Sequence, residues 1–85
     1  MSLSITEFNE AIKLSEKLAS NIGMLKGIAV LSKPYKMYDG VSGIEFNVYD
    51  CRGCYYKTYY TGRHNDIFEL IQSLRYQVAR IISEC

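Results

Sequence analysis

The chain has 85 residues, which is enough for one domain with its own hydrophobic core and too few for a second domain. Hydrophobic residues make up 48% and charged residues 22% of the chain, proportions that exclude a disordered or fibrous protein. The formal net charge of +1 at pH 7 gives no general attraction to nucleic acid or to anionic membranes. The sequence therefore predicts a single small globular domain over residues 1–85.

The first predicted element is an amphipathic helix that begins after Ser4. Ser4-Ile5-Thr6-Glu7 has the pattern of a capping box, in which the Ser4 and Glu7 side chains each accept a hydrogen bond from the other residue's backbone N–H. An apolar stripe with helical spacing follows, formed by Phe8, Ala11, Ile12, Ser15, Leu18, Ala19 and Ile22. We expect the helix to stop at Gly23, with the alternative that it continues across Gly23 and Gly27.

The next element is a short strand at Ile28–Leu31, which is apolar enough to be buried on both faces. Proline cannot donate to a strand ladder and restricts the residue before it, so Lys33-Pro34 is expected to end this strand. The segment 35–43 is then predicted to be a loop or an irregular edge.

Residues 44–61 are predicted to form a β-hairpin. The arm 44–49 alternates apolar and polar residues, and the arm 54–61 is rich in tyrosine and threonine. Asp50 suits the first position of a type I turn, and Gly53 suits the left-handed position that closes a three-residue loop with a bulge. This turn pairs Asp50 with Cys54.

The register counted outward from that turn decides which residues face the core. It pairs Val48 with Tyr56, and further along the arms it pairs Phe46 with Thr58 and Ile44 with Tyr60. The opposite face then collects Glu45, Asn47, Tyr49, Tyr55, Lys57 and Tyr59. A two-residue turn at Arg52-Gly53 would pair Val48 with Lys57 and carry a charge toward the core, so we favour the bulged register.

A second helix is predicted from Asn65 or Asp66 to the C-terminus. Its apolar stripe consists of Ile67, Leu70, Ile71, Leu74, Val78, Ile81 and Ile82. The predicted fold is α+β with the order α-β-β-β-α, in which both helices pack on one face of a small three-stranded antiparallel sheet. The other face of the sheet is then left uncovered.

The chain contains few residues that suggest chemistry. Cys51-x-x-Cys54 has the spacing of a zinc-binding pair, and His64 and Cys85 would raise the ligand number to four, but a second closely spaced pair is lacking. His64 is the only histidine, and no nucleophile is placed beside it by the sequence. We therefore expect no metal, no cofactor and no catalysis, with structural or incidental cysteines and a solvated turn histidine.

Two surfaces are candidates for binding. The open face of the sheet, with Tyr49, Tyr55 and Tyr59 around Lys57, could stack unpaired bases or anchor a protein partner, because tyrosine gives a large contact area at low entropic cost. Tyrosine is also simply a good strand former. On the second helix Phe68, Gln72 and Tyr76 form a largely uncharged strip that could contact another helix.

The element order, with Pro34-Tyr35 early and Phe46-x-Val48 in the middle strand, resembles the double-stranded RNA-binding domain. That family carries a basic cluster at the start of its last helix, where this chain has Asn65-Asp66-Ile67. Arg52-Gly53-Cys54-Tyr55 likewise replaces its glycine-rich entry into the third strand. Both are positions at which that family contacts RNA, so we do not assign the chain to it.

The sequence thus favours a small non-catalytic interaction or regulatory protein, such as an adaptor or an inhibitor of a larger protein. We expect a homodimer formed through the tyrosine face or the strip from Phe68 to Tyr76, because covering exposed apolar surface helps so short a chain. The alternative is a nucleic-acid-binding module that uses the tyrosine face. The N-terminus has no signal-peptide pattern and three cysteines fit a reducing compartment, so we expect a cytoplasmic protein without membrane contact.

Overall fold

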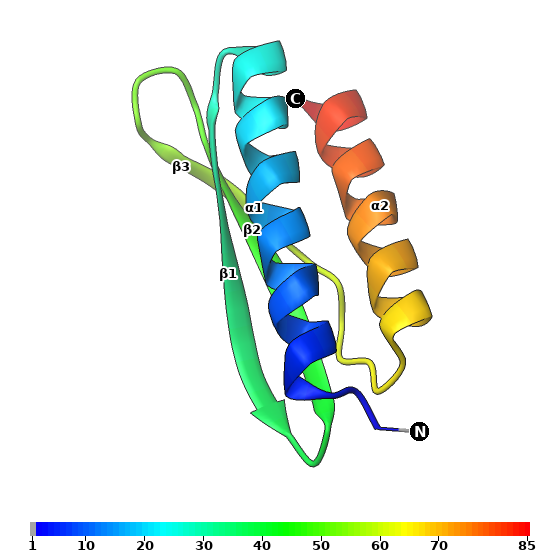
Figure 1. The fold of residues 1–85 in the computed structure, drawn as a ribbon. Coiled ribbons are helices and arrows are strands. Elements are labelled where there is room, and N and C mark those ends of the chain that lie inside the picture. The colour runs from blue at the N-terminus through cyan, green and yellow to red at the C-terminus, as the bar shows by residue number, and fades with distance from the viewer. Residues whose placement is uncertain (1) are drawn as a thin grey trace.

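The computed structural model describes residues 2–85, except for the side chains of residues 36–38. The elements are helix α1 (Ile5–Lys26), strands β1 (Ala29–Tyr38), β2 (Val41–Tyr49) and β3 (Tyr55–Tyr60), and helix α2 (Ile67–Glu84). The strands form one antiparallel sheet in the order β1-β2-β3 (Figure 1). The predicted α-β-β-β-α order is therefore confirmed.

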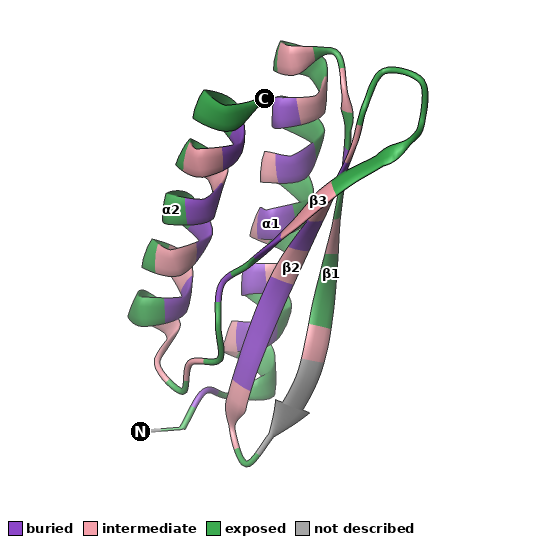
Figure 2. Ribbon diagram, turned by 180° about the vertical axis from the view of Figure 1, so that it is seen from behind, coloured by how far each residue is buried: buried purple, intermediate pink, exposed green. Residues whose placement is uncertain are grey.

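Both helices cover the same face of the sheet, and the other face has no helix on it (Figures 1 and 2). The central strand β2 directs Ile44, Phe46 and Val48 toward the helices, and all three side chains are buried. They meet an apolar stripe from each helix, formed by Phe8, Ala11, Ala19 and Ile22 on α1 and by Leu70, Leu74 and Ile81 on α2. The hydrophobic effect from this two-layer core holds the helices to the sheet.

Helix α1 begins with the predicted capping box. The Glu7 N–H donates to Ser4 Oγ at 3.1 Å, and the Ser4 N–H donates to Glu7 Oε1 at 3.0 Å. The predicted stop at Gly23 is wrong, because the helix continues to Lys26 and ends at Gly27, which has φ +69°. Gly23 serves close packing instead, since a Cβ there would lie 2.9 Å from the carbonyl oxygen of Ile28.

Strand β1 is longer than predicted and runs through Pro34. Pro34 faces Ile44 of β2, and the N–H and C=O of Ile44 point the other way, to the side chain and N–H of Thr61. The Pro34–Ile44 pair thus needs no ladder bond, so proline is tolerated on this edge strand. The start of β1 is buried on one face only, because Val30 is buried whereas Leu31 is exposed.

The predicted turn between β2 and β3 is confirmed, but the predicted register is wrong. The Asp50 N–H donates to the Cys54 carbonyl, the Asp50 carboxylate accepts from the N–H groups of Arg52 and Cys54, and Gly53 has φ +84°. A further bulge between Val48 and Tyr49 then shifts the ladder by one residue. The resulting pairs are Val48 with Lys57, Phe46 with Tyr59, and Glu45 with Tyr60.

From Lys57 onward, that shift exchanges the two faces of β3, because side chains alternate along a strand. Tyr59 enters the core with 1% of its surface exposed. Lys57 does lie on the helix side, yet its ammonium reaches the rim of the core and pairs with Glu84 at 3.3 Å. The rejected pairing of Val48 with Lys57 is thus tolerated, since lysine can bury its stem and keep its charge near solvent.

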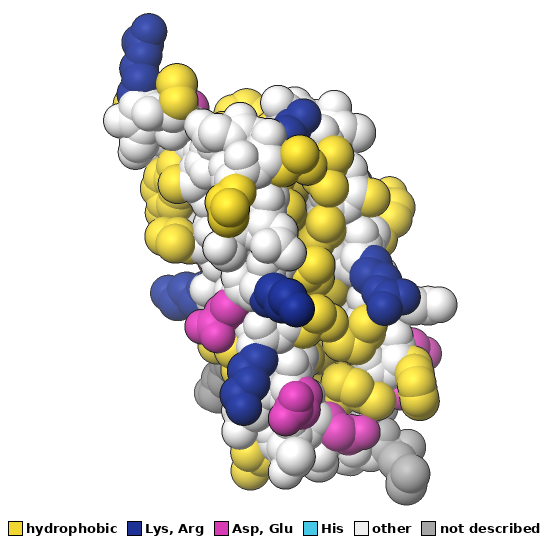
Figure 3. Space-filling view, turned by 45° about the horizontal axis from the view of Figure 1, so that its top comes forward, with side chains coloured by type: hydrophobic (Ala, Val, Ile, Leu, Met, Phe, Trp, Pro, Cys, Tyr) yellow, Lys and Arg dark blue, Asp and Glu magenta, His cyan; other side chains and the backbone are white. Residues whose placement is uncertain are grey.

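Helix α2 is capped by the predicted Asp66, whose side chain accepts from the Phe68 N–H, and it ends at Glu84. Hydrophobic side chains line the contact between α1 and α2 (Figure 3). Within residues 2–85, neither helix has the length and apolarity needed to cross a bilayer.

Candidate functional site

The open face is the side of the sheet that points away from the helices. On β2 it carries the residues that alternate with the buried ones, and on β1 and β3 it carries their cross-strand partners and near neighbours. Its members are Leu31, Lys33 and Tyr35 on β1, Glu45, Asn47 and Tyr49 on β2, and Tyr55, Thr58 and Tyr60 on β3. Tyr49 and Tyr55 lie where the sequence placed them, whereas the predicted Lys57 and Tyr59 lie on the helix side.

Tyr35 forms one end of the open face by lying across a floor of two glycines. Its hydroxyl oxygen accepts from the Gly62 N–H at 2.9 Å, and its ring passes so close to Gly43 that a Cβ there would collide with ring carbons. The ring of Tyr60 meets that of Tyr35 edge to face, with centroids 5.8 Å apart. Glycine at position 43 is thus what allows an aromatic ring to cover this end of the sheet.

A chain of hydrogen bonds crosses the middle of the open face from β3 to β2. The Thr58 hydroxyl donates to Asn47 Oδ1 at 2.7 Å, which leaves its oxygen to accept from the Tyr55 hydroxyl at 2.6 Å. Asn47 Nδ2 in turn donates to Glu45 Oε2 at 3.0 Å. Since the Thr58, Asn47 and Tyr55 side chains already bond to one another, covering them costs less than covering polar groups with no partner.

The second aromatic pair of the open face is Tyr49 and Tyr55, whose rings meet edge to face with centroids 5.9 Å apart. Leu31, Tyr55 and Tyr60 are each more than half exposed. Among the side chains assigned to the open face, the only charged ones are Lys33 and Glu45, which face each other across β1 and β2. The face is therefore aromatic, ordered and close to neutral.

Tyr59, Lys57 and two residues of α2 form a polar cluster at the opposite side of the sheet. The Tyr59 hydroxyl donates to Glu84 Oε1 at 2.8 Å, and Lys57 and Arg80 pair with the same carboxylate at 3.3 and 3.2 Å. Burial, followed by the bond to Glu84, raises the pKa of Tyr59 above its ordinary range. The bond from Tyr59, with those from Lys57 and Arg80, lowers the pKa of Glu84. The cluster ties the end of α2 to β3.

His64 lies between Ser73 and Glu69 in an arrangement that resembles a hydrolytic triad. Its Nε2 is 2.9 Å from Ser73 Oγ, and its Nδ1 is 3.7 Å from Glu69 Oε2. However, Nε2 is also 2.9 Å from the carbonyl oxygen of Thr61, which can only accept. Nε2 must therefore carry a proton and has no lone pair for Ser73, so this arrangement links the loop before α2 to the helix and does not activate a nucleophile.

The remaining predicted residues do not join the open face. Phe68, Gln72 and Tyr76 are exposed on the outer side of α2, as their helical spacing predicted. Cys51 and Cys54 are exposed in the β2–β3 turn, and Cys85 is exposed at the end of α2. Over the described part of the chain, no three His, Cys, Asp or Glu side chains gather in a group that could hold a metal ion.

Sequence reasoning missed five members of the open face, which are Leu31, Lys33, Tyr35, Thr58 and Tyr60. Leu31 was assigned to a strand buried on both sides, and Tyr35 to a loop after Pro34. Gly43 on β2 and Gly62 just after β3 are a signal that could have placed an aromatic ring above them. Comparison of the chain with protein-family models, with curated proteins and with solved structures found no match.

Proposed function

We propose that this chain is a non-catalytic interaction protein, of the adaptor or inhibitor kind, that binds a larger protein through the open face of its sheet. The observation that carries the proposal is that this face holds four tyrosines in two edge-to-face pairs and a chain of hydrogen bonds among its polar side chains. Interfaces of this kind bind well because ordered aromatic side chains lose little entropy on binding. Tyr55, Tyr60 and Leu31 would supply most of the contact area.

The charge of the open face favours a protein partner over nucleic acid. Proteins that bind single-stranded nucleic acid combine aromatic platforms with a positively charged groove. Among the described side chains of the face the one lysine, Lys33, stands opposite Glu45, so these two residues give phosphate groups no net attraction. Lys57, which the sequence placed among the tyrosines, is on the other side and is paired with Glu84.

The test compares two tyrosines with similar exposure on different surfaces. Tyr60 on the open face is 56% exposed and Tyr76 on α2 is 64% exposed, so Tyr76→Ala is a matched control for Tyr60→Ala. The immobilised chain should capture a protein partner from its host extract, and Tyr60→Ala should weaken capture at least about tenfold while Tyr76→Ala leaves it unchanged.

Capture should also survive nuclease treatment and change little with salt, because an apolar interface releases no condensed counterions. If nuclease or moderate salt removes the partner, the face binds nucleic acid. If Tyr76→Ala is the damaging variant, the interaction belongs to α2. Either result would reject the proposed function.

A further inference from the structure

One end of the molecule combines a protruding apolar segment with an apolar hollow. The last turn of α1, the β2–β3 turn and the end of α2 all lie at this end (Figure 1). Met24 and Leu25 in the last turn of α1 are 82% and 69% exposed. Two exposed aliphatic side chains in succession beside an apolar hollow form a contiguous apolar surface, which is the kind of surface that marks an interaction site.

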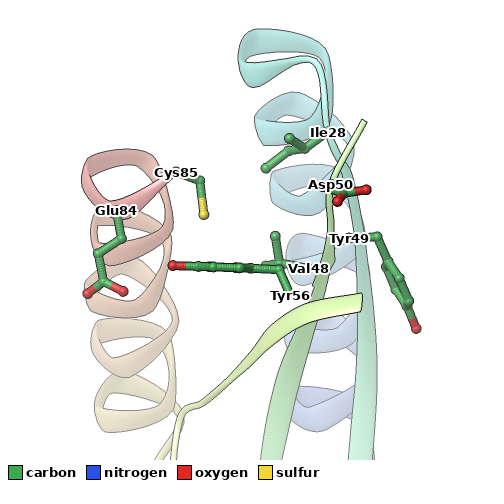
Figure 4. Close-up of a pocket in the computed structure, with 7 residues that line it drawn as sticks. All are labelled: Ile28, Val48, Tyr49, Asp50, Tyr56, Glu84 and Cys85. Carbon is green, nitrogen blue, oxygen red and sulfur yellow. The ribbon is translucent and has the colours of Figure 1, made fainter. Parts of the chain in front are cut away.

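The end hollow has a volume of about 220 Å³ and lies between the strands and the end of α2. It is lined by Ile28, Val48, Tyr49, Asp50, Tyr56, Glu84 and Cys85 (Figure 4). The Tyr56 ring extends from β3 toward α2, and the Cys85 thiol points into the same space (Figure 4). Since a cavity of roughly 150 Å³ can hold benzene, the end hollow has room for one or two aliphatic side chains.

We propose that this end is a self-association surface, on which Met24 and Leu25 of one copy enter the end hollow of a second copy. The protruding residues and the end hollow lie at the same end of one chain. A two-fold axis at that end would therefore let each copy insert its Met24 and Leu25 into the end hollow of the other. Such an interface closes on itself and does not propagate into a filament. Met24 would also bring its sulfur to the partner's Tyr56 ring, which is a favourable contact.

The charges at this end support pairing of two copies. Lys26 follows the protruding residues in the sequence and Asp50 lines the end hollow, so the proposed arrangement would set a lysine of one copy at the end that carries a carboxylate of the other. The net charge of each copy is only +1, which gives little repulsion between copies. Electrostatics therefore favours this orientation over a random encounter.

The area that this contact buries predicts a weak dimer. Met24, Leu25, Tyr56 and Ile82 from both copies would contribute on the order of 1,000 Å² in total, near the lower limit of specific interfaces. The dimer should therefore dissociate in the micromolar range. It leaves both open faces uncovered, and it does not depend on the proposed function of that face.

The test uses sedimentation and small-angle X-ray scattering on the whole chain from low to high micromolar concentration. The molecule is 41 Å long and 18 Å wide, so an end-to-end dimer should have a maximum dimension that approaches twice 41 Å. Packing through the open faces would keep the dimension close to that of one copy. The double variant Met24→Gln/Leu25→Gln should weaken the dimer at least about tenfold without lowering the melting temperature.

Ile5→Gln is the matched control, because Ile5 is 68% exposed on the same helix at the opposite end. It should leave the dimer unchanged. A second readout is the thiol of Cys85, measured with Cys51 and Cys54 replaced by serine: its alkylation should slow as the concentration rises in this background and should not slow when the double variant is added. A monomer at high micromolar concentration, or a dimer that resists the double variant, would overturn the inference.

Discussion

Replacing Gly43 by alanine should destabilise the protein by about 2–4 kcal/mol, although it adds a single methyl group. Gly43 does not have a positive φ, so the cost comes from contacts. The new Cβ would collide with the Tyr35 ring and would lie 2.6 Å from the carbonyl oxygen of Gly62, a backbone atom that cannot rotate away. Overpacking of this kind costs about 1–3 kcal/mol.

Further losses follow if the Tyr35 ring is displaced. Its hydrogen bond from the Gly62 N–H contributes about 1 kcal/mol, and its edge-to-face contact with Tyr60 contributes about 0.5–1.5 kcal/mol. For a domain of this size, a loss of 2 kcal/mol or more lowers the melting temperature by at least about 8 °C. Thermal unfolding followed by circular dichroism measures this directly.

A double-mutant cycle shows whether the Tyr35 ring is the cause. In a Tyr35→Ala background, the added cost of Gly43→Ala should fall by at least about 1 kcal/mol, because the ring is no longer there to be displaced. The reasoning is refuted if Gly43→Ala costs less than about 0.5 kcal/mol, or if its cost is the same in both backgrounds.

Three other predictions concern the core, its rim and the β2–β3 turn. Tyr59→Ala should cost about 3–5 kcal/mol in urea unfolding because it empties a buried site, whereas the exposed Tyr60→Ala should cost under about 1 kcal/mol. The reverse order of costs would restore the register predicted from the sequence. Because the pKa of Glu84 is lower in the folded chain, its contribution to stability is present above the unfolded value of about 4.5 and is lost as the pH falls through the folded value. Glu84→Gln should therefore lower stability at pH 7 and reduce the loss seen on acidification, and an unchanged pH profile would contradict the assignment. Asp50→Ala should cost about 1–2 kcal/mol by unfolding the β2–β3 turn locally, and hydrogen exchange at the Arg52 and Cys54 amides should become faster if that is right.

The sequence predicted the order of elements because capping and periodicity are local signals. The capping box at Ser4, the Asp66 cap and the Asp50–Gly53 turn each depend on residues within a few positions of one another. Two apolar helical stripes and an alternating strand then require both helices to lie on one face. The fold class followed from these features together.

The errors arose where a contact distant in sequence decides the outcome. Pro34 stays in a strand because the ladder bonds of Ile44 go to Thr61, which lies 17 residues further along the chain. The bulge beside Tyr49 moves Tyr59 into the core, where its hydroxyl donates a hydrogen bond to Glu84 near the end of the chain. A one-residue shift in register moves side chains to the other face of the strand. The sequence therefore predicted an open sheet face that carries tyrosines and placed Tyr49 and Tyr55 on it correctly, but it also placed Lys57 and Tyr59 there, which is wrong.

The most direct test of the proposed function is a titration of the ¹⁵N-labelled chain with its captured protein partner, followed by NMR chemical shifts. We predict that the largest shifts occur at Leu31, Tyr49, Tyr55 and Tyr60 on the open face, with little change at Phe68 and Tyr76 on α2. Shifts concentrated on the outer side of α2, with the amides of the open face unchanged, would contradict the assignment of the open face as the binding surface.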